Sequence, residues 1–337
     1  MEFKLLKIFP DELQGEWNAL LENSVTHVPF MRYEYQKTWW ETRGGGEWKN
    51  IDLFIVVAYQ DGELCGIAPL FYTNDHGGDP SLMLVGSIEV SDYLDLIARP
   101  EDLEEFVDGL LPFLEGSVFP AWNKIDLYNI LDGSPTIKSL EAATNRQGWT
   151  FNLDRLQHSP YIPLPGDWET YLAGIDKKQR HEVRRKIRRL EESEAQSRWY
   201  IVEDRDSLDR EIAEFLEMMV LDPKKAEFLT PEMKDHMYRT VHCAFDQGCL
   251  CLAFLEINGE KAAGKLCFDY LDRIWAYNSG VNRKFNEYSP GWVLLGYLLQ
   301  WANEKKYHEV DMMRGDEDYK YRFGGIDRFV MRATISR

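Results

Sequence analysis

The sequence predicts an α/β protein made of two tandem units, each a mixed, mostly antiparallel sheet with helices on both faces. Three observations carry this prediction. The chain has 337 residues, which is room for about two domains. Each half contains a hairpin, with turns at Asp61-Gly62 and Asn258-Gly259. Each hairpin is followed by a strand, a largely apolar helix and another strand.

The two halves match at a nearly constant spacing. Gly62 and Gly259 are 197 residues apart, and Asp126 and Asp311 are 185 residues apart. Loops of different length account for the change in spacing. The pattern therefore predicts an internal duplication with a pseudo-twofold relation between the units.

A proline-rich segment, 158–166, separates the two patterns and is the best linker in the chain. It predicts an N-terminal unit at 1–157 and a C-terminal unit at 158–337. The C-terminal unit is the expected donor-binding unit.

In the first half, apolar periodicity alternates between helix and strand. The expected helices cover 13–22, 103–114 and 135–147, a further helix carries Trp39-Trp40, and the expected strands cover 52–59, 66–72, 81–85, 124–129 and 149–153. Acids interrupt a strand-like pattern at 91–96. A carboxylate within a half-buried strand costs free energy unless it is paired or functional, so Asp92 is a candidate site residue; the alternative is a carboxylate at the end of a loop.

The second half begins with a helix capped by Asp167 and a basic helix at 176–192. The following elements are strands at 199–202, 250–256, 262–270, 274–279 and 308–313 and helices at 208–221, 231–246 and 292–305. The basic helix is the only dense positive patch of the chain. It is either a solvated face or an anion-binding surface, since so many like charges repel one another unless an anion binds.

The stretch 274–322 has the outline of an acyl- or phosphate-binding site. A strand leads through Ser289-Pro290-Gly291 into an apolar helix, and backbone N–H groups at a helix start favour phosphate or developing negative charge. The next strand ends at a loop rich in titratable side chains, Arg314–Lys320.

The bulk composition limits the partners. A net charge of −18 argues against general nucleic-acid affinity. The five cysteines show no metal-ligand spacing, which predicts buried free thiols, a reducing compartment and no metal. The N-terminal residues do not resemble a signal peptide, and no stretch is apolar enough to span a membrane, so we expect a cytoplasmic protein.

Several short motifs, in order, resemble the duplicated form of the GNAT acyltransferase superfamily. They are similar to the acetyltransferase-like family associated with cellulose and exopolysaccharide biosynthesis, and to its relatives, the Fem-type aminoacyl transferases. The matching motifs are Pro29-Phe30 before Trp39-Trp40, Gly66–Leu70, Ser91–Asp95, the arginine-rich helix after Trp168 and Tyr171, Ser289-Pro290-Gly291, and Gly315 with Tyr319-Lys320.

The resemblance implies transfer of an acyl group from acyl-CoA, such as acetyl-CoA, to an amine or hydroxyl by direct attack. In such folds the strand before the central helix separates from its neighbour, and its N–H groups hold the thioester carbonyl. The donor-binding residues implied are Tyr277, Ser279, Arg283, Ser289 and Gly291.

For the chemistry, the resemblance implies a base and an acid. Asp311 is the candidate base and Tyr319 the candidate acid, with a structural carboxylate and a surface loop as the alternatives. The acceptor would be a small molecule, nucleotide-sugar or glycan precursor. Its candidate contacts are Asp92, Tyr93, Arg184, Arg314 and Lys320, with Asp92 and Tyr93 expected in a groove between the units.

One departure keeps other functions open. The usual Arg/Gln-x-x-Gly-x-Gly/Ala turn of the superfamily is absent, since 282–292 contains only Gly291. A Fem-type transferase that uses aminoacyl-tRNA and a non-catalytic binding subunit of a polysaccharide-synthesis system therefore remain as alternatives. The oligomeric state does not follow from the sequence.

Overall fold

The structure is a computed structural model that describes residues 1–337, and the chain forms two compact units. Unit 1 comprises Met1–His158 together with Arg328–Arg337, and unit 2 comprises Ser159–Asp327. The chain first passes from unit 1 to unit 2 after His158, one residue from the expected boundary. The last ten residues, expected in the C-terminal unit, belong instead to unit 1, because they form a strand of its sheet.

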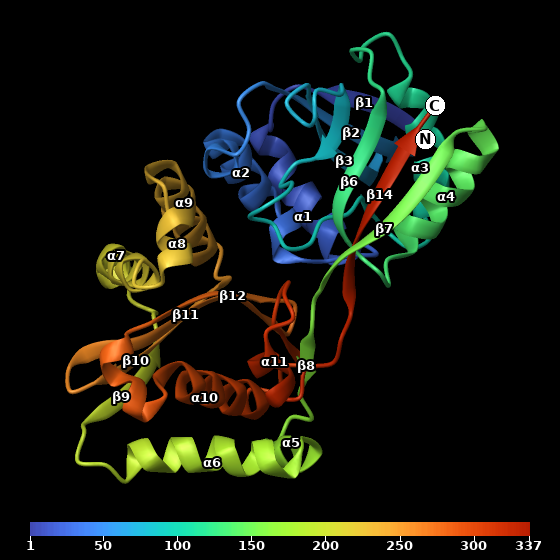
Figure 1. The fold of residues 1–337 in the computed structure, drawn as a ribbon. Coiled ribbons are helices and arrows are strands. Elements are labelled where there is room, and N and C mark those ends of the chain that lie inside the picture. Colours follow the sequence, from blue (N-terminus) through green and yellow to red (C-terminus); the bar gives the residue numbers. More distant parts are fainter. The chain divides into compact units, whose positions relative to one another are not determined.

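Unit 1 is a mixed sheet with helices packed on it (Figure 1). Its strands are β1 (Glu2–Leu6), β2 (Ile51–Gln60), β3 (Glu63–Thr73), β4 (Ser81–Leu84), β5 (Ile97–Ala98), β6 (Lys124–Leu131), β7 (Thr150–His158) and β14 (Phe329–Ser336). Its helices are α1 (Gln14–Glu22), α2 (Tyr33–Gly46), α3 (Leu103–Leu114) and α4 (Pro135–Gln147). The strand order is β1-β2-β3-β4-β6-β14-β7, and β5 pairs with β3.

Unit 2 is a second mixed sheet, in the order β8-β13-β12-β11-β10-β9. Its strands are β8 (Tyr161–Pro163), β9 (Ser197–Ile201), β10 (Leu250–Ile257), β11 (Glu260–Tyr270), β12 (Arg273–Val281) and β13 (Glu309–Asp311). Its helices are α5 (Trp168–Gly174), α6 (Lys177–Glu191), α7 (Leu208–Met219), α8 (Pro223–Phe228), α9 (Pro231–Asp246), α10 (Pro290–Glu304) and α11 (Asp318–Arg322).

The predicted duplication is visible in the strand order. Reading β1-β2-β3-β4-β6-β14 beside β9-β10-β11-β12-β13-β8 gives six corresponding strands. In both sheets the fourth and fifth strands are the parallel pair. Asp126 lies opposite Met83 in the first pair, and Asp311 lies opposite Trp275 in the second. The two aspartates therefore occupy equivalent positions.

Helix α10 is the central helix of unit 2. Pro290 suits the first helical position, where its missing N–H costs nothing, and a run of leucines then supplies the buried face. The core that α10 forms with the sheet also contains Tyr171 and Leu172 of α5 and Val183 of α6. Helices α5, α6 and α10 thus lie on one face of the sheet, and α7 lies on the other (Figure 1).

Several elements were not predicted, because their sequences are short or lack a period. β8 lies in the predicted linker, α11 lies in the predicted loop 314–320, and 91–96 is a loop rather than a strand. β1, α8 and β14 were also missed. The missed strands are fixed by tertiary pairing, as when β8 takes its register from Val310 of β13.

Candidate functional site

The site begins where β12 and β13 separate. The two strands pair in parallel only from Arg273↔Glu309 to Trp275↔Asp311, although β12 continues to Val281. Next to this point the β11–β12 register shifts, so that two residues of β12, 276 and 277, lie opposite Cys267. A bulge bends a strand locally, which explains the separation. Beyond Trp275 one edge of β12 has no strand opposite it, as the resemblance implied.

Two predicted donor residues lie on this bent part of β12. Tyr277 packs against Phe268, with 5.5 Å between ring centroids. The Ser279 N–H donates to Asn278 Oδ1 at 2.9 Å, and Ser279 pairs in register with Lys265 of β11.

The turn into α10 holds the other predicted donor residues together. Ser289 has a left-handed backbone (φ 52°), and its carbonyl accepts the N–H groups of Trp292 and Val293 at 3.0 and 3.1 Å. Pro290 has no N–H, so the Gly291 N–H is the first exposed donor of the helix. A Cβ on Gly291 would lie 3.0 Å from Val281 Cγ2, so this turn packs closely on the end of β12. Arg283 lies in the exposed segment between β12 and α10.

A cavity of about 190 Å³ lies beside this turn. Strands β11 and β12 supply one wall, and α10 and α11 supply the others. Its lining residues are Gly264, Lys265, Ser279, Val281, Gly291, Trp292, Leu294, Leu295, Tyr319 and Phe323. The cavity thus brings together three of the predicted site residues, Ser279, Gly291 and Tyr319.

A second cavity, of about 280 Å³, lies at the same end of β12 and also reaches Ser279 and Val281. Arg283 lines it, as does Lys225 of α8, whose ammonium donates to Asn278 Oδ1 at 2.9 Å and to the Ser279 carbonyl. Burial and, to a lesser extent, the positive charge of the neighbouring Lys265 lower the pKa of Lys225 to about 8. The end of β12 is therefore flanked by two lysines.

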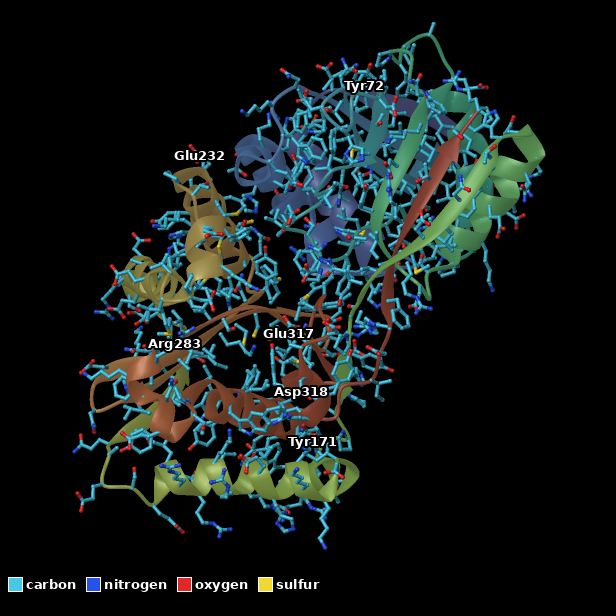
Figure 2. The ribbon with its side chains drawn as sticks, in the orientation of Figure 1. Tyr72, Tyr171, Glu232, Arg283, Glu317 and Asp318 are labelled. Atoms are coloured by element: carbon cyan, nitrogen blue, oxygen red, sulfur yellow. The ribbon has the colours of Figure 1, made fainter.

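The loop after β13 is fixed by Asp311 and Lys320. The fully buried Asp311 carboxylate accepts the Met313 N–H at 2.7 Å. The Lys320 ammonium, also buried, donates to the carbonyls of Met313, Arg314 and Gly315 at 3.1, 2.7 and 3.1 Å. It also pairs at 2.8 Å with Glu317, which is labelled in Figure 2. Lys320 is thus enclosed by its own loop.

The side chains of this loop differ in charge state. Burial raises the pKa of Tyr319, so its hydroxyl stays protonated at neutral pH. Burial would also raise the pKa of Glu317, but the hydrogen bond and charge of Lys320 outweigh it and the net shift is downward. The side chain of Arg314 is partly exposed.

The duplicate carboxylate in unit 1 is a structural ion-pair centre. Asp126 is fully buried and accepts two bonds of 2.7 Å from Arg332 on β14. His76 lies 3.1 Å and Lys124 3.4 Å from the same carboxylate. Burial raises the pKa of Asp126, but Arg332 and the other cations shift it below its ordinary value.

The remaining predicted residues lie elsewhere. Asp92 and Tyr93 lie in a loop of unit 1, and Tyr93 is fully buried, with its ring centroid 6.2 Å from Phe30. Arg184 on α6 pairs with Glu169. The exposed face of α6 retains further cations, including Arg188 and Arg189.

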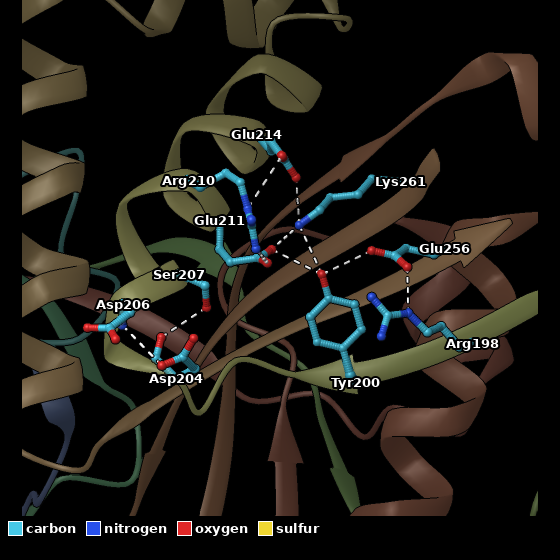
Figure 3. Close-up of polar contacts among 10 residues, drawn as sticks. All are labelled: Arg198, Tyr200, Asp204, Asp206, Ser207, Arg210, Glu211, Glu214, Glu256 and Lys261. Atoms are coloured by element: carbon cyan, nitrogen blue, oxygen red, sulfur yellow. Dashed lines mark hydrogen bonds and ion pairs between the residues drawn. The ribbon is translucent and has the colours of Figure 1, made fainter. Parts of the chain in front are cut away.

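A larger groove of about 810 Å³ lies in unit 2, and most of its charged side chains bind one another (Figure 3). The Lys261 ammonium binds Glu211, Glu214 at 2.8 Å, and the Tyr200 hydroxyl at 3.0 Å. Glu256 pairs with Arg198 at 2.6 Å. Such a network stabilises β9, β11 and α7 against one another.

Sequence reasoning missed Lys225, Lys265 and Trp292. The signal for Lys265 was present, since it is a lone lysine within the apolar run Ala262–Phe268. The five cysteines are free, as predicted, and four of them are buried. The structure holds no cluster of three or more His, Cys, Asp or Glu side chains placed to bind a metal ion. None of its helices combines the length and apolarity required to cross a bilayer.

Comparison with known proteins places the site in context. Residues 177–321, which contain α6 to α11, match the acetyltransferase (GNAT) domain family. No curated protein matches the chain significantly in sequence.

Solved structures share the fold over most or all of the chain. The crystal structure of FemX aligns with a TM-score of 0.65 and 12% identity, covering 98% of this chain and 97% of that one. A conserved protein of unknown function from Bacteroides thetaiotaomicron aligns with a TM-score of 0.62 and 11% identity over the full length of both chains. The C-terminal domain of a putative lysylphosphatidylglycerol synthetase from Agrobacterium fabrum aligns with a TM-score of 0.52 and 12% identity, covering 83% of this chain and 84% of that one. At these identities the likeness concerns the fold.

Proposed function

We propose, from the match of residues 177–321 to an acetyltransferase domain, that the protein transfers an acyl group from acyl-CoA to an amine or hydroxyl. The observation that carries the proposal is the separation of β12 from β13 after Trp275, beside the start of α10. A bent strand edge and a helix N-terminus at one place supply donors for a thioester carbonyl and for a pyrophosphate.

The donor residues divide into two groups. The Gly291 N–H and the Arg283 guanidinium lie at the turn into α10 and would bind the phosphates. The backbone of Tyr277 to Ser279 would hold the thioester carbonyl, and the cavity behind Ser279 would take the acyl group. The residues present fit the donor, because N–H groups and cations meet at this turn. The 190 Å³ cavity has no carboxylate among its lining side chains, and the second cavity has one, Asp222, beside its two cations.

The reaction is a direct transfer. The nitrogen or oxygen of the acceptor attacks the thioester carbon, the carbon–sulfur bond breaks, and the acceptor's proton replaces the lost bond on sulfur to give free CoA. Tyr319 would protonate the leaving thiolate and regain a proton from the acceptor, since its side chain lines the cavity and its hydroxyl stays protonated at neutral pH.

Asp311 and Lys320 have positioning roles in this proposal. The predicted base Asp311 is fully buried and already accepts the Met313 N–H, and its duplicate Asp126 is an ion-pair centre. The predicted acceptor contact Lys320 is enclosed by three carbonyls. Both residues would hold the loop that carries Tyr319.

The acceptor is proposed as a chemical class and not as a single compound. A glycan precursor or nucleotide-sugar, as in cellulose and exopolysaccharide biosynthesis, follows from the family resemblance alone, and Asp92, Tyr93, Arg184 and Arg314 remain its candidate contacts. The exposed cations of α6 favour one alternative, a Fem-type transfer from aminoacyl-tRNA, because they are arranged along one helix.

Binding measurements test the proposal. Acetyl-CoA should raise the melting temperature and appear bound in native mass spectra, and Arg283→Ala should weaken that binding while Lys234→Ala, on the exposed face of α9, should not. Failure of a panel of acyl-CoAs to bind would overturn the proposal. Salt-sensitive binding of tRNA that is lost in Arg188→Ala/Arg189→Ala would favour the alternative.

A further inference from the structure

Lys265 is a buried lysine of unit 2 whose charge has no bonded partner. Its side chain is only 6% exposed, it projects from β11 into the 190 Å³ cavity, and no hydrogen bond or ion pair satisfies its ammonium. The carboxylate that influences it electrostatically, Glu317, is already bound to Lys320. A buried charge without a partner costs free energy, so its presence requires an explanation.

The other polar groups of the cavity are also mainly donors. The indole Nε1–H of Trp292 is buried and has no partner. The Gly291 N–H has no backbone acceptor, and Gly291 and Tyr319 line the same cavity. The Ser279 carbonyl, the nearby backbone acceptor, is taken by Lys225 from the other side of β12. The cavity thus contains several donors and no carboxylate.

The rest of the lining is apolar and limits the size of a ligand. Val281, Leu294, Leu295 and Phe323 close the cavity around its polar groups. The volume of about 190 Å³ equals roughly six water molecules, enough for a chain of a few carbons that ends in a charged group.

We propose that this cavity binds a small carboxylate-bearing group, with Lys265 as its counterion and Trp292 Nε1–H as a second donor. The group belongs either to the acyl chain of the donor or to an amino-acid acceptor. The inference rests on the proposed transferase function and specifies the substrate class of that site.

The burial of Lys265 is consistent with this role. Burial lowers the pKa of Lys265, and the neighbouring Cys267 and Glu317 oppose this shift only in part. A bound carboxylate would favour the charged form. The preference for a carboxylate should therefore weaken as pH rises from 7 to 10, while the ligand carboxylate itself stays ionised.

The test compares ligands that differ only in the carboxylate. In one arm, calorimetry compares the binding of succinyl-CoA to the protein with that of butyryl-CoA. In the other, 4-aminobutyrate is compared with butylamine, with and without saturating CoA. We expect a preference of about tenfold for the carboxylate-bearing member of one pair, and the pair identifies the source of the group.

Variants assign the preference to this cavity. Lys265→Met should abolish the preference and raise the melting temperature of the free protein, because it removes an uncompensated buried charge. Lys265→Arg should retain the preference, and Trp292→Phe should reduce it without removing a charge. Lys224→Met, on an exposed site of α8, is the matched control and should change nothing.

The outcomes separate the two proposals. Equal binding within both pairs, or a preference that survives in Lys265→Met, would overturn the carboxylate site even if CoA binds. Failure of every CoA derivative to bind would overturn the transferase proposal, and the 4-aminobutyrate comparison without CoA would still decide on the cavity.

Discussion

Asp311 and Lys320 hold the same residue, Met313, from its two sides. The carboxylate accepts the Met313 N–H at 2.7 Å, and the ammonium donates to the Met313 carbonyl at 3.1 Å. Met313 has a positive φ of 61°, a conformation that costs free energy for a side chain of this kind. The two buried charges thus compensate a strained backbone at the start of the loop that leads to Tyr319.

Lys320→Met should destabilise unit 2 by about 3 kcal/mol, because three carbonyls and Glu317 lose a buried partner. Urea unfolding measures this loss. Lys305→Met, at an exposed position after α10, provides the control. A loss below about 1 kcal/mol would mean that the loop keeps its conformation without the ammonium.

Asp311→Asn separates a positioning role from a catalytic one. An amide oxygen can still accept the Met313 N–H, so turnover should stay within about threefold of the wild type. A general base lost at this position would instead reduce turnover by about 10² or more. Asp311→Ala, which removes the acceptor altogether, should lower both stability and turnover.

Gly291→Ala should weaken acyl-CoA binding, because the added Cβ would press on Val281 at 3.0 Å and narrow the entrance between α10 and β12. The double variant Gly291→Ala/Val281→Ala removes the opposing methyl groups and should recover affinity. Calorimetric titration of acetyl-CoA against the two single variants and the double variant measures the coupling. Additive effects would place the turn outside the binding site.

Lys225 should make stability depend on pH in the alkaline range. Its folded-state pKa, about 8, lies below the ordinary value of 10.5 given for an unperturbed lysine, so the unfolded chain binds more protons between these values. Stability from this group therefore rises as pH increases from about 8 to 10.5. Thermal unfolding of Lys225→Met should lack this rise, and an identical profile in both proteins would show that Lys225 titrates normally when folded.

The sequence predicted what depends on period and turn chemistry. The hairpins at Asp61-Gly62 and Asn258-Gly259, the helix entered through Pro290 and the strand predicted at 308–313 are local patterns. The structure contains them, the last as the shorter strand β13, Glu309–Asp311. The strand order of the two sheets also agrees with the predicted duplication.

The sequence did not predict features that depend on tertiary contacts. Lys320 belongs to a charged loop in sequence, yet it is buried because the carbonyls of its own loop surround it. Lys265 was overlooked because only the packing of α10 and α11 over β11 encloses it in a cavity. Strand β14 was missed because its pairing partners, β6 and β7, lie far away in sequence.

The return of β14 to unit 1 sets an order for biosynthesis. Unit 2 is continuous, whereas unit 1 needs a strand translated after all of unit 2. A nascent chain can therefore complete its second unit while β6 and β7 of the first still present unpaired edges to one another and to other chains. Chaperones that cover these unpaired edges, or fast release of the finished chain, would affect the yield of the protein more than the stability of either finished sheet.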